Sequence, residues 1–164
     1  MKNDVDEVGF EAFVQTIRRW LRREAYGICG DWYEADDLVQ VALYKVHQRW
    51  DQLDRHAELG AYARRVVVHS FLTERRRSRW RHEVATLVAT DDVPTPNSYN
   101  AVDDRALLLP ALRRLGSRQR AVVTLRFLGD LSVEQTARLL GCSPRTVTSQ
   151  TVRALQTLRH DLQN

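Results

Sequence analysis

The stretch LSVEQTARLLGCSPRTVTSQ, residues 131–150, decides the fold of the C-terminal part of the chain. Ser132 and Gln135 have the spacing of a capping box, which starts a helix at this point. Gly141 then permits a sharp turn, and the Ser-Pro pair at 143–144 supplies an N-cap and a first helical proline for a second helix. Two short helices around a tight turn predict a helix-turn-helix, a motif whose second helix reads the DNA major groove.

The second helix of this pair is predicted to have one buried and one outward face. Helical spacing assigns the buried face to Val147, Thr151, Ala154, Leu155 and Leu158. The outward residues near the helix start, which we predict to contact DNA, are Ser143, Arg145, Thr146, Thr148, Ser149 and Arg153. Arginine pairs with guanine, and Ser or Thr bonds bases or phosphates. The alternative is a helical hairpin whose polar face is merely solvated.

A change in composition divides the chain into two modules. The segment TLVATDDVPTPNSYNAVDD has four aspartates, no Lys or Arg and little apolar periodicity, and it is predicted to be an extended, mobile linker. The expected domains are therefore residues 1–85 and 105–164, joined by an acidic linker at 86–104. No stretch shows the sustained alternation of a strand, so we predict an all-α protein of two small helical domains.

Three helices are predicted in the N-terminal module. Apolar residues recur at helical spacing from Phe10 to Leu21 and from Leu38 to Trp50, and a third helix begins near Glu58. Gly30 and Asp31 suit the break between the first two helices. The C-terminal module is predicted to hold four: a leucine stripe at 107–115, a helix capped by Ser117 and stopped by Gly129, and the helix-turn-helix pair.

Composition and charge narrow the function classes. The formal net charge is +4, and positive charge is concentrated in residues 64–82, where seven arginines face one glutamate. Such a cluster favours a polyanionic partner. No apolar run approaches the roughly 18 residues that a membrane span needs, and no signal peptide is seen, so we expect a cytoplasmic protein without membrane insertion. Cys29 and Cys142 are expected to be reduced thiols.

Two strings together carry a family resemblance. GDWYEADDLVQVALYKVHQRWDQL, residues 30–53, and LPALRRLGSRQRAVVTLRFLGDLSVEQTARLLGCS, residues 109–143, resemble bacterial RNA polymerase sigma factors of the extracytoplasmic-function (group 4) type. Within this type the chain is similar to the high-GC, actinobacterial-like SigE subgroup. The resemblance runs from about Phe10 to Arg159. It implies a promoter-specificity subunit with a region 2 domain, a linker and a region 4 domain.

The resemblance implies contacts with RNA polymerase core, at the largest-subunit clamp helices and the beta flap. The residues that match the polymerase-docking helix are Asp36, Asp37, Leu38, Val39 and Gln40, with Trp50 further along. Acidic residues beside an exposed Leu/Val patch suit a basic, partly apolar coiled coil. The alternative is an acidic helix start favourable to the macrodipole, with Leu38 and Val39 in the core. Val41 stands where the family usually has an acidic residue.

The resemblance also implies that the third helix recognises and melts the minus-ten element, while the helix-turn-helix binds the minus-thirty-five element. Aromatic faces and cations capture an unstacked strand. The matching residues are Tyr62, Arg64, Arg65, His69, Phe71, Arg75, Arg76, Arg77, Arg79 and Trp80. For Tyr62 and Phe71 a core role is an open alternative, and the arginines could form a solvated basic tail. His69 stands where the family often has Asn, near the flipped base.

Other readings of the sequence lead to different partners. A helix-turn-helix regulator that does not engage polymerase would leave ADDLVQ and the arginine–aromatic segment unexplained. A nuclease using Asp36, Asp37 and His47 is excluded, because His47 lies about 15 Å along the helix from the carboxylates. We therefore expect no enzyme activity, no cofactor and no metal. The family resemblance adds an anti-sigma protein as a possible partner, and we expect a monomer when the chain is free.

Overall fold

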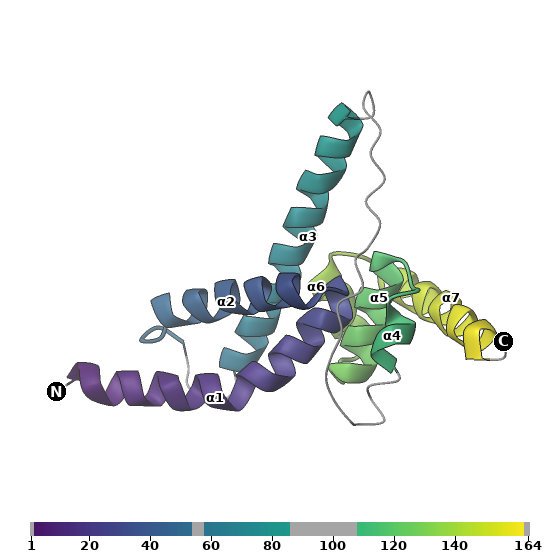
Figure 1. Ribbon diagram of the computed structural model, residues 1–164. Coiled ribbons are helices and arrows are strands. Elements are labelled where there is room, and N and C mark those ends of the chain that lie inside the picture. The colour runs from purple at the N-terminus through teal and green to yellow at the C-terminus, as the bar shows by residue number, and fades with distance from the viewer. Residues whose placement is uncertain (1, 54–57, 86–107, 163–164) are drawn as a thin grey trace.

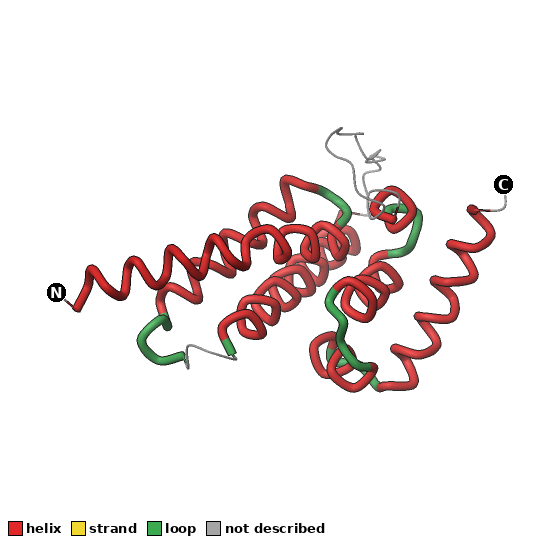
Figure 2. The backbone as a smooth tube through the Cα atoms, turned by 90° about the horizontal axis from the view of Figure 1, so that it is seen from below, coloured by secondary structure: helices red, strands yellow, loops and turns green. Residues whose placement is uncertain are grey.

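The computed structural model describes residues 2–53, 58–85 and 108–162, and these form helices joined by short connections without strands (Figure 1). The all-α expectation is confirmed. The same path drawn as a tube shows the first and last helices extending to opposite sides of the molecule, with helices of the two halves meeting between them (Figure 2). The expected linker at 86–104 lies outside the described residues.

The N-terminal module contains three long helices: α1 (Lys2–Cys29), α2 (Trp32–Gln48) and α3 (Leu59–Ala85). The predicted break between the first two is confirmed. Gly30 adopts a left-handed φ of +79°, which favours glycine, and Asp31 caps α2 by accepting a hydrogen bond of 2.9 Å from the backbone N–H of Glu34. This turn reverses the chain, so that α2 packs back along α1 (Figure 1).

The core of this module lies between the three helices. Its fully buried members include Leu21, Ile28, Val46, Val67 and Phe71, the last with 2% of its surface exposed. Trp50 packs at the open end, where its ring lies 5.2 Å from Phe10 and 5.5 Å from Phe13 between centroids. Aromatic pairs at these separations add to the stability gained from area burial.

The C-terminal module consists of α4 (Leu108–Leu112), α5 (Ser117–Val123), a π-helical turn η2 (Thr124–Leu128), α6 (Val133–Leu140) and α7 (Pro144–Leu162). The capping box of Ser132 and Gln135 is confirmed, with hydrogen bonds of 3.0 and 2.8 Å. Gly141 has the left-handed φ of +64° that the turn between α6 and α7 needs. The Ser143 hydroxyl accepts from the Thr146 N–H at 3.1 Å, as an N-cap should.

Two local predictions in this module were wrong. Ser117 is the first residue of α5 rather than its cap, because Gly116 takes the capping position without a side-chain hydrogen bond. The predicted stop at Gly129 is confirmed, because this residue is the C-cap, although the five residues before it form the π-helical turn η2. Leu155 is 39% exposed, although Val147, Ala154 and Leu158 are buried as predicted. The buried stripe of α7 is therefore narrower than the sequence suggests.

The two modules pack into one body. Ala121 and Leu125, from α5 and η2, belong to the same buried cluster as Leu21, Ile28 and Phe71 of the N-terminal module. In addition, α5 and η2 lie against α1, and α6 lies against α3. We call this arrangement the closed form. It places the helix-turn-helix beside α3, which carries more arginines than any other helix of the described chain.

Candidate functional site

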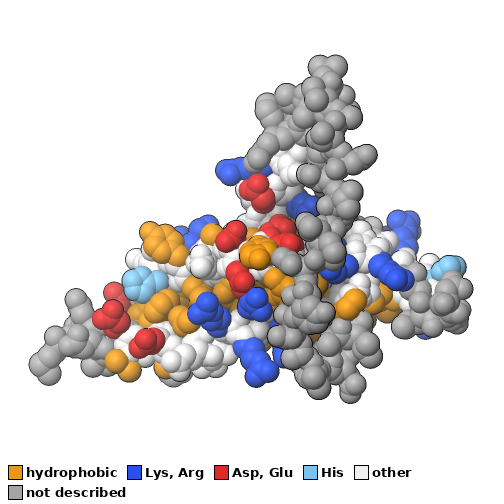
Figure 3. All heavy atoms as spheres, viewed as in Figure 1, with side chains coloured by type: hydrophobic (Ala, Val, Ile, Leu, Met, Phe, Trp, Pro, Cys, Tyr) orange, Lys and Arg blue, Asp and Glu red, His pale blue; other side chains and the backbone are white. Residues whose placement is uncertain are grey.

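The outer face of α2 exposes a mixed aromatic and polar surface. Tyr33, Asp37, Gln40 and Tyr44 follow one another at intervals of three or four residues and are exposed, with Val41 exposed beside them. Tyr33 and Tyr44 expose 70% and 63% of their surface, unusual values for large aromatic side chains. Hydrophobic, acidic and basic groups lie side by side over α1 and α2 (Figure 3). Exposed aromatic side chains are enriched at protein interfaces relative to the rest of the surface.

The sequence-predicted polymerase residues divide between this face and the core. Asp37 and Gln40 lie on the outer face, whereas the expected exposed Leu/Val patch was wrong: Leu38 and Val39 are 7% and 3% exposed. Both side chains point toward α1 and α3 and belong to the core, as the alternative interpretation of these residues predicted. Trp50 is 8% exposed and packs on the aromatic rings of α1. Tyr33 and Tyr44 were missed, although their spacing from Asp37 places them on the same helical face.

Asp36 has a structural partner, Arg22, although 47% of its side chain remains exposed. Its carboxylate accepts two hydrogen bonds from the Arg22 guanidinium, at 2.5 Å from Nε and 3.2 Å from Nη2. Hydrogen bonding to Arg22 lowers the pKa of this carboxyl. The pair joins α1 to α2, and Arg22 also lies 4.3 Å from the centre of the Trp32 ring. Asp36 therefore orients α2 and is less available to a partner than Asp37.

The first half of α7 presents the predicted DNA-contacting residues. Arg145, Thr148, Ser149 and Arg153 are exposed, while Thr146 is half-buried. Two of the hydroxyls are held by the helix itself: Thr148 donates to Pro144 O at 3.1 Å and Ser149 to Thr146 O at 3.1 Å. The face also includes an apolar side chain that the sequence analysis did not select. Val152 is 49% exposed and lies one turn beyond Ser149, in line with Arg145.

The predicted strand-capturing residues of α3 are only partly accessible. Arg65, His69, Arg76 and Arg77 are exposed, and Arg64, Tyr62 and Arg75 are half-buried. Phe71 is in the core, as its alternative reading proposed, so its ring does not present a stacking face in the closed form. The side chains of Arg79 and Trp80 lie outside the described part of the chain.

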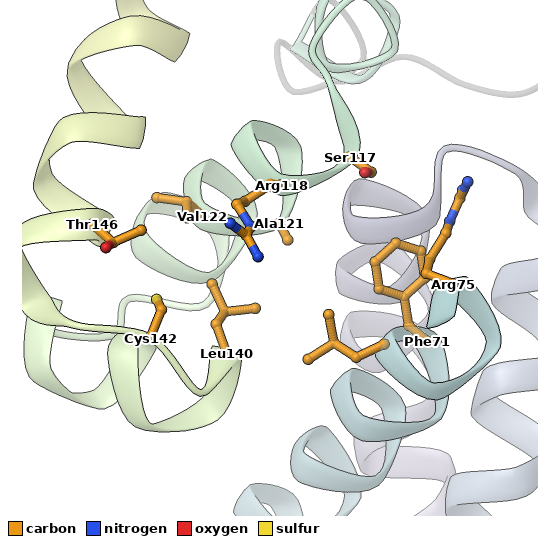
Figure 4. Close-up of a pocket in the computed structure, with 10 residues that line it drawn as sticks. Phe71, Arg75, Ser117, Arg118, Ala121, Val122, Leu140, Cys142 and Thr146 are labelled. Atoms are coloured by element: carbon orange, nitrogen blue, oxygen red, sulfur yellow. The ribbon is translucent and has the colours of Figure 1, made fainter. Parts of the chain in front are cut away.

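The C-terminal module packs against one face of α3, mainly through α6. A small pocket of 60 Å³ separates Phe71, Leu72 and Arg75 from α5, α6 and the start of α7 (Figure 4). Figure 4 shows Leu140 and Ala121 on one wall and Phe71 with Arg75 on the other. A wider cleft lies between the Arg64–His69 stretch and α6. A nucleic-acid strand that lies along this face of α3 would therefore have to share the space with α6.

Polar contacts buried at the junction hold the two modules together. The Arg64 guanidinium donates to Glu24 at 2.5 and 3.1 Å and to the carbonyl oxygen of Gly129 at 3.4 Å. Burial raises the pKa of Glu24, and the hydrogen bonds and charge of Arg64 oppose that rise. Arg120 is 8% exposed and donates to the carbonyl oxygens of Ile28 and Cys29 at 2.9 and 3.0 Å. These carbonyls end α1 and have no partner within the helix.

The π-helical turn η2 packs closely against α1 at the same junction between the modules. Gly27 of α1 faces Thr124, the first residue of η2, and a Cβ at Gly27 would lie 2.6 Å from the Thr124 hydroxyl oxygen. Such a distance excludes any side chain at Gly27 unless the helices separate. Gly30 likewise leaves room for the Arg120 guanidinium, which would lie 3.1 Å from a Cβ there. Arg120 and Glu24 were not selected from the sequence, because nothing in their spacing distinguishes them from surface charges.

Comparisons with known proteins identify the family. Residues 13–81 match the model for Sigma-70 region 2, and residues 105–158 match that for Sigma-70, region 4. The chain is 36% identical over 156 residues to the RNA polymerase sigma-E factor of Streptomyces coelicolor, covering 93% of this chain and 85% of that protein. It belongs to the sigma-70 family. The ECF RNA polymerase sigma factor SigL of Mycobacterium tuberculosis is 32% identical over 146 residues, with 87% and 82% of the two chains covered.

These relatives confirm the extracytoplasmic-function type that the two sequence strings suggested. The sigma factor RpoE of Bartonella quintana, solved in complex with the anti-sigma factor NepR, matches this sigma factor with a TM-score of 0.71 at 23% identity. That match covers 94% of this chain and 96% of the other, and it shows that the fold is shared.

The described residues contain neither a metal-binding cluster nor a helix that could span a membrane. No group of three His, Cys, Asp or Glu side chains there is placed to hold a metal ion. None of the helices in the described ranges combines the length and apolar character that crossing a bilayer demands.

Proposed function

We propose that this sigma factor divides promoter recognition among three surfaces: the outer face of α2 for polymerase, the start of α7 for the minus-thirty-five element, and α3 for the minus-ten element. As a sigma factor, the chain directs RNA polymerase core to promoters and initiates transcription there. Its domain order, region 2 before region 4, supports this assignment of roles.

The polymerase surface is assigned to Tyr33, Asp37, Gln40, Val41 and Tyr44. This face is exposed in the closed form, and no other part of the described chain covers it. Aromatic side chains carry much of the binding energy at protein interfaces, and a central carboxylate gives orientation against a basic partner. Leu38, Val39 and Trp50 support the surface from below by fixing α2 on the core.

The minus-thirty-five surface is assigned to Arg145, Thr148, Ser149 and Arg153, with Val152 as an apolar member. A guanidinium can bond guanine O6 and N7 together, and an aliphatic side chain can contact a thymine methyl group. All five side chains are exposed while region 4 rests on region 2. Duplex DNA binding by α7 therefore does not require the closed form to open.

The minus-ten surface has a different requirement. Arg64 is engaged by Glu24 and Gly129, and α6 lies beside the arginines of α3. We therefore propose that the closed form is a resting state, and that region 4 leaves α3 when the sigma factor binds polymerase and opens DNA. A protein that holds the two regions together, such as an anti-sigma factor, would keep the chain inactive.

Run-off transcription tests the proposal. Core polymerase with the chain should initiate from a cognate promoter, and core polymerase alone should not. Tyr44→Ala should lower co-purification with core polymerase without altering the melting temperature, because the Tyr44 side chain is exposed. Arg19→Ala, on an exposed position of α1, is the matched surface control. A chain that binds promoter duplex yet never associates with core polymerase would refute the assignment of α2.

A further inference from the structure

A cleft with an unusual charge balance lies where the two regions meet. Its volume is about 510 Å³, and it is lined by Ala61, Arg64, Arg65, His69, Leu131, Gln135, Arg138 and Leu139. Region 2 contributes two arginines and a histidine through α3, and region 4 contributes Arg138 through α6. None of the eight lining residues is an aspartate or a glutamate, so both walls of the cleft carry positive charge.

Of the three arginines that line the cleft, Arg64 alone forms an ion pair with a carboxylate of the described chain. Arg64 pairs with Glu24, which lies behind the cleft wall. Within the described part of the chain, no carboxylate forms an ion pair with Arg65 or Arg138, and both side chains are exposed. Like charges that face each other across an interface cost free energy. An anion between the two walls would convert that repulsion into attraction to both regions.

The shape and chemistry of the cleft select the kind of anion. The planar guanidinium groups of Arg65 and Arg138 match phosphate oxygens in a bidentate geometry. Gln135 adds an amide donor, and Ala61, Leu131 and Leu139 add an apolar wall. Sites for small ligands enclose about 300–1,000 Å³, a range that includes this cleft. A ligand with two or more linked phosphates could reach arginines on both walls.

We propose that this cleft binds a small oligophosphate, either a nucleoside polyphosphate or a short inorganic chain, and that the bound ligand fixes region 4 on region 2. The inference rests on the proposed function, because Arg64, Arg65 and His69 belong to the proposed minus-ten surface. Ligand and melted DNA strand therefore exclude each other. A small ligand is favoured over a DNA backbone because the cleft exists only while α6 lies beside α3.

Isothermal titration of the full chain tests the site, with inorganic tripolyphosphate and ATP as separate probes. We expect one ligand per chain and weaker binding at higher salt. Arg138→Gln and Arg65→Gln should each weaken binding at least fivefold. Arg19→Gln removes the same charge from an exposed site on α1 and should change affinity less than twofold. Ligand should also slow amide hydrogen exchange in both 59–72 and 131–140, because it bridges both regions.

The outcomes separate the possibilities. Tighter binding of ATP than of tripolyphosphate would assign the site to nucleotides, and equal binding would assign it to the phosphate chain alone. Equal losses of affinity in Arg138→Gln and Arg19→Gln, or several weak sites per chain, would overturn the proposal. It would also be overturned if Arg138→Gln weakened the binding of a short DNA duplex but not the binding of either phosphate probe. A chain that supports run-off transcription but binds neither probe would refute this site and leave the proposed function intact.

Discussion

Arg120 of region 4 caps the last turn of a region 2 helix: its Nη2 donates to the carbonyl oxygen of Cys29 at 3.0 Å. The same guanidinium reaches Ile28 O at 2.9 Å and Leu115 O of its own region at 3.3 Å. Burial lowers the pKa of Arg120, but an arginine stays protonated in proteins. A buried cation that satisfies carbonyls of both regions makes the closed form a specific structure rather than a loose contact.

Replacing Arg120 should therefore open the closed form. Arg120→Met keeps the length of the side chain but leaves the end of α1 uncapped, at a cost of about 1–3 kcal/mol for the lost charged hydrogen bonds. Small-angle scattering should show a larger radius of gyration, while the helix content by circular dichroism stays unchanged. Arg159→Met, at an exposed position near the end of α7, is the control and should remain compact. An Arg120→Met chain as compact as the wild type would contradict this role.

A side chain introduced at Gly27 should also open the closed form, by a steric clash with Thr124. Gly27→Ala places a methyl group 2.6 Å from the Thr124 hydroxyl and 2.7 Å from its methyl group. The substitution should stabilise the α1 helix itself by about 1 kcal/mol, because alanine has a higher intrinsic helix propensity than glycine. Region 2 should therefore stay folded while region 4 is displaced.

The double variant Gly27→Ala with Thr124→Ala provides the check on this steric clash. It removes both clashing atoms and leaves only the Cβ of residue 124, at 3.2 Å. It should recover most of the compactness in scattering. Failure of Thr124→Ala to rescue Gly27→Ala would show that the displaced contact is elsewhere.

The Glu24 carboxyl should give stability a defined pH dependence. Burial raises its pKa above the ordinary value of 4.5, so the folded chain binds this proton at a higher pH than the unfolded chain does. The contribution of Glu24 to the free energy of unfolding should rise as pH falls through the raised pKa, and the gain should be complete below 4.5.

Urea denaturation at a series of pH values measures this contribution. Glu24→Gln keeps an acceptor for Arg64 but cannot titrate, so the difference in unfolding free energy between the wild type and this variant should shift in favour of the wild type toward low pH. A difference that does not change with pH, or that changes in the opposite direction, would contradict the burial of an ionisable Glu24.

The two cysteines should differ in reactivity. Burial raises the pKa of the Cys29 thiol to about 12, and its sulfur lies 3.1 Å from Asp31 O. The thiolate is the reactive form, so Cys29 should resist iodoacetamide at pH 8 in the closed form. Cys142 is only half-buried and should be alkylated first. Mass spectrometry of the modified peptides distinguishes the two sites, and equal labelling of both would contradict the closed packing around Cys29.

The reading face of α7 should control promoter choice. Arg145→Ala should cost about 1–3 kcal/mol of discrimination at one base pair of the minus-thirty-five element if Arg145 makes a bidentate base contact. Transcription from a panel of single-base promoter variants measures this. Arg19→Ala should leave the relative transcription from these promoter variants unchanged. Unaltered base preference in Arg145→Ala would remove this residue from the reading surface.

Sequence patterns predicted the parts of this structure that local interactions decide. The capping box of Ser132 and Gln135, the left-handed turn at Gly141 and the break at Gly30 depend on residues within one or two turns, and all three are confirmed. The outward residues of α7 follow from helical periodicity in the same way. Leu38 and Val39 were ambiguous, because a half-apolar helix does not say which neighbour covers its stripe.

The junction between the regions could not be predicted in this way. Arg120 contacts Cys29 and Ile28 across about ninety residues of sequence, and Thr124 fits Gly27 only because η2 departs from α-helical geometry. A buried arginine has the same sequence signature as a surface arginine. Long-range packing, rather than local propensity, therefore decides which face of α3 is covered in the closed form.

The opening of the closed form is tested most directly by the distance between the two regions. Fluorophores attached to Gln15→Cys on α1 and Glu134→Cys on α6, in a chain carrying Cys142→Ser, would report this distance by energy transfer; both labelled positions are exposed. High transfer is expected in the free chain and a clear decrease in a transcribing complex with core polymerase. Transfer that stays at the free-chain value while the complex initiates from its promoter would contradict the account.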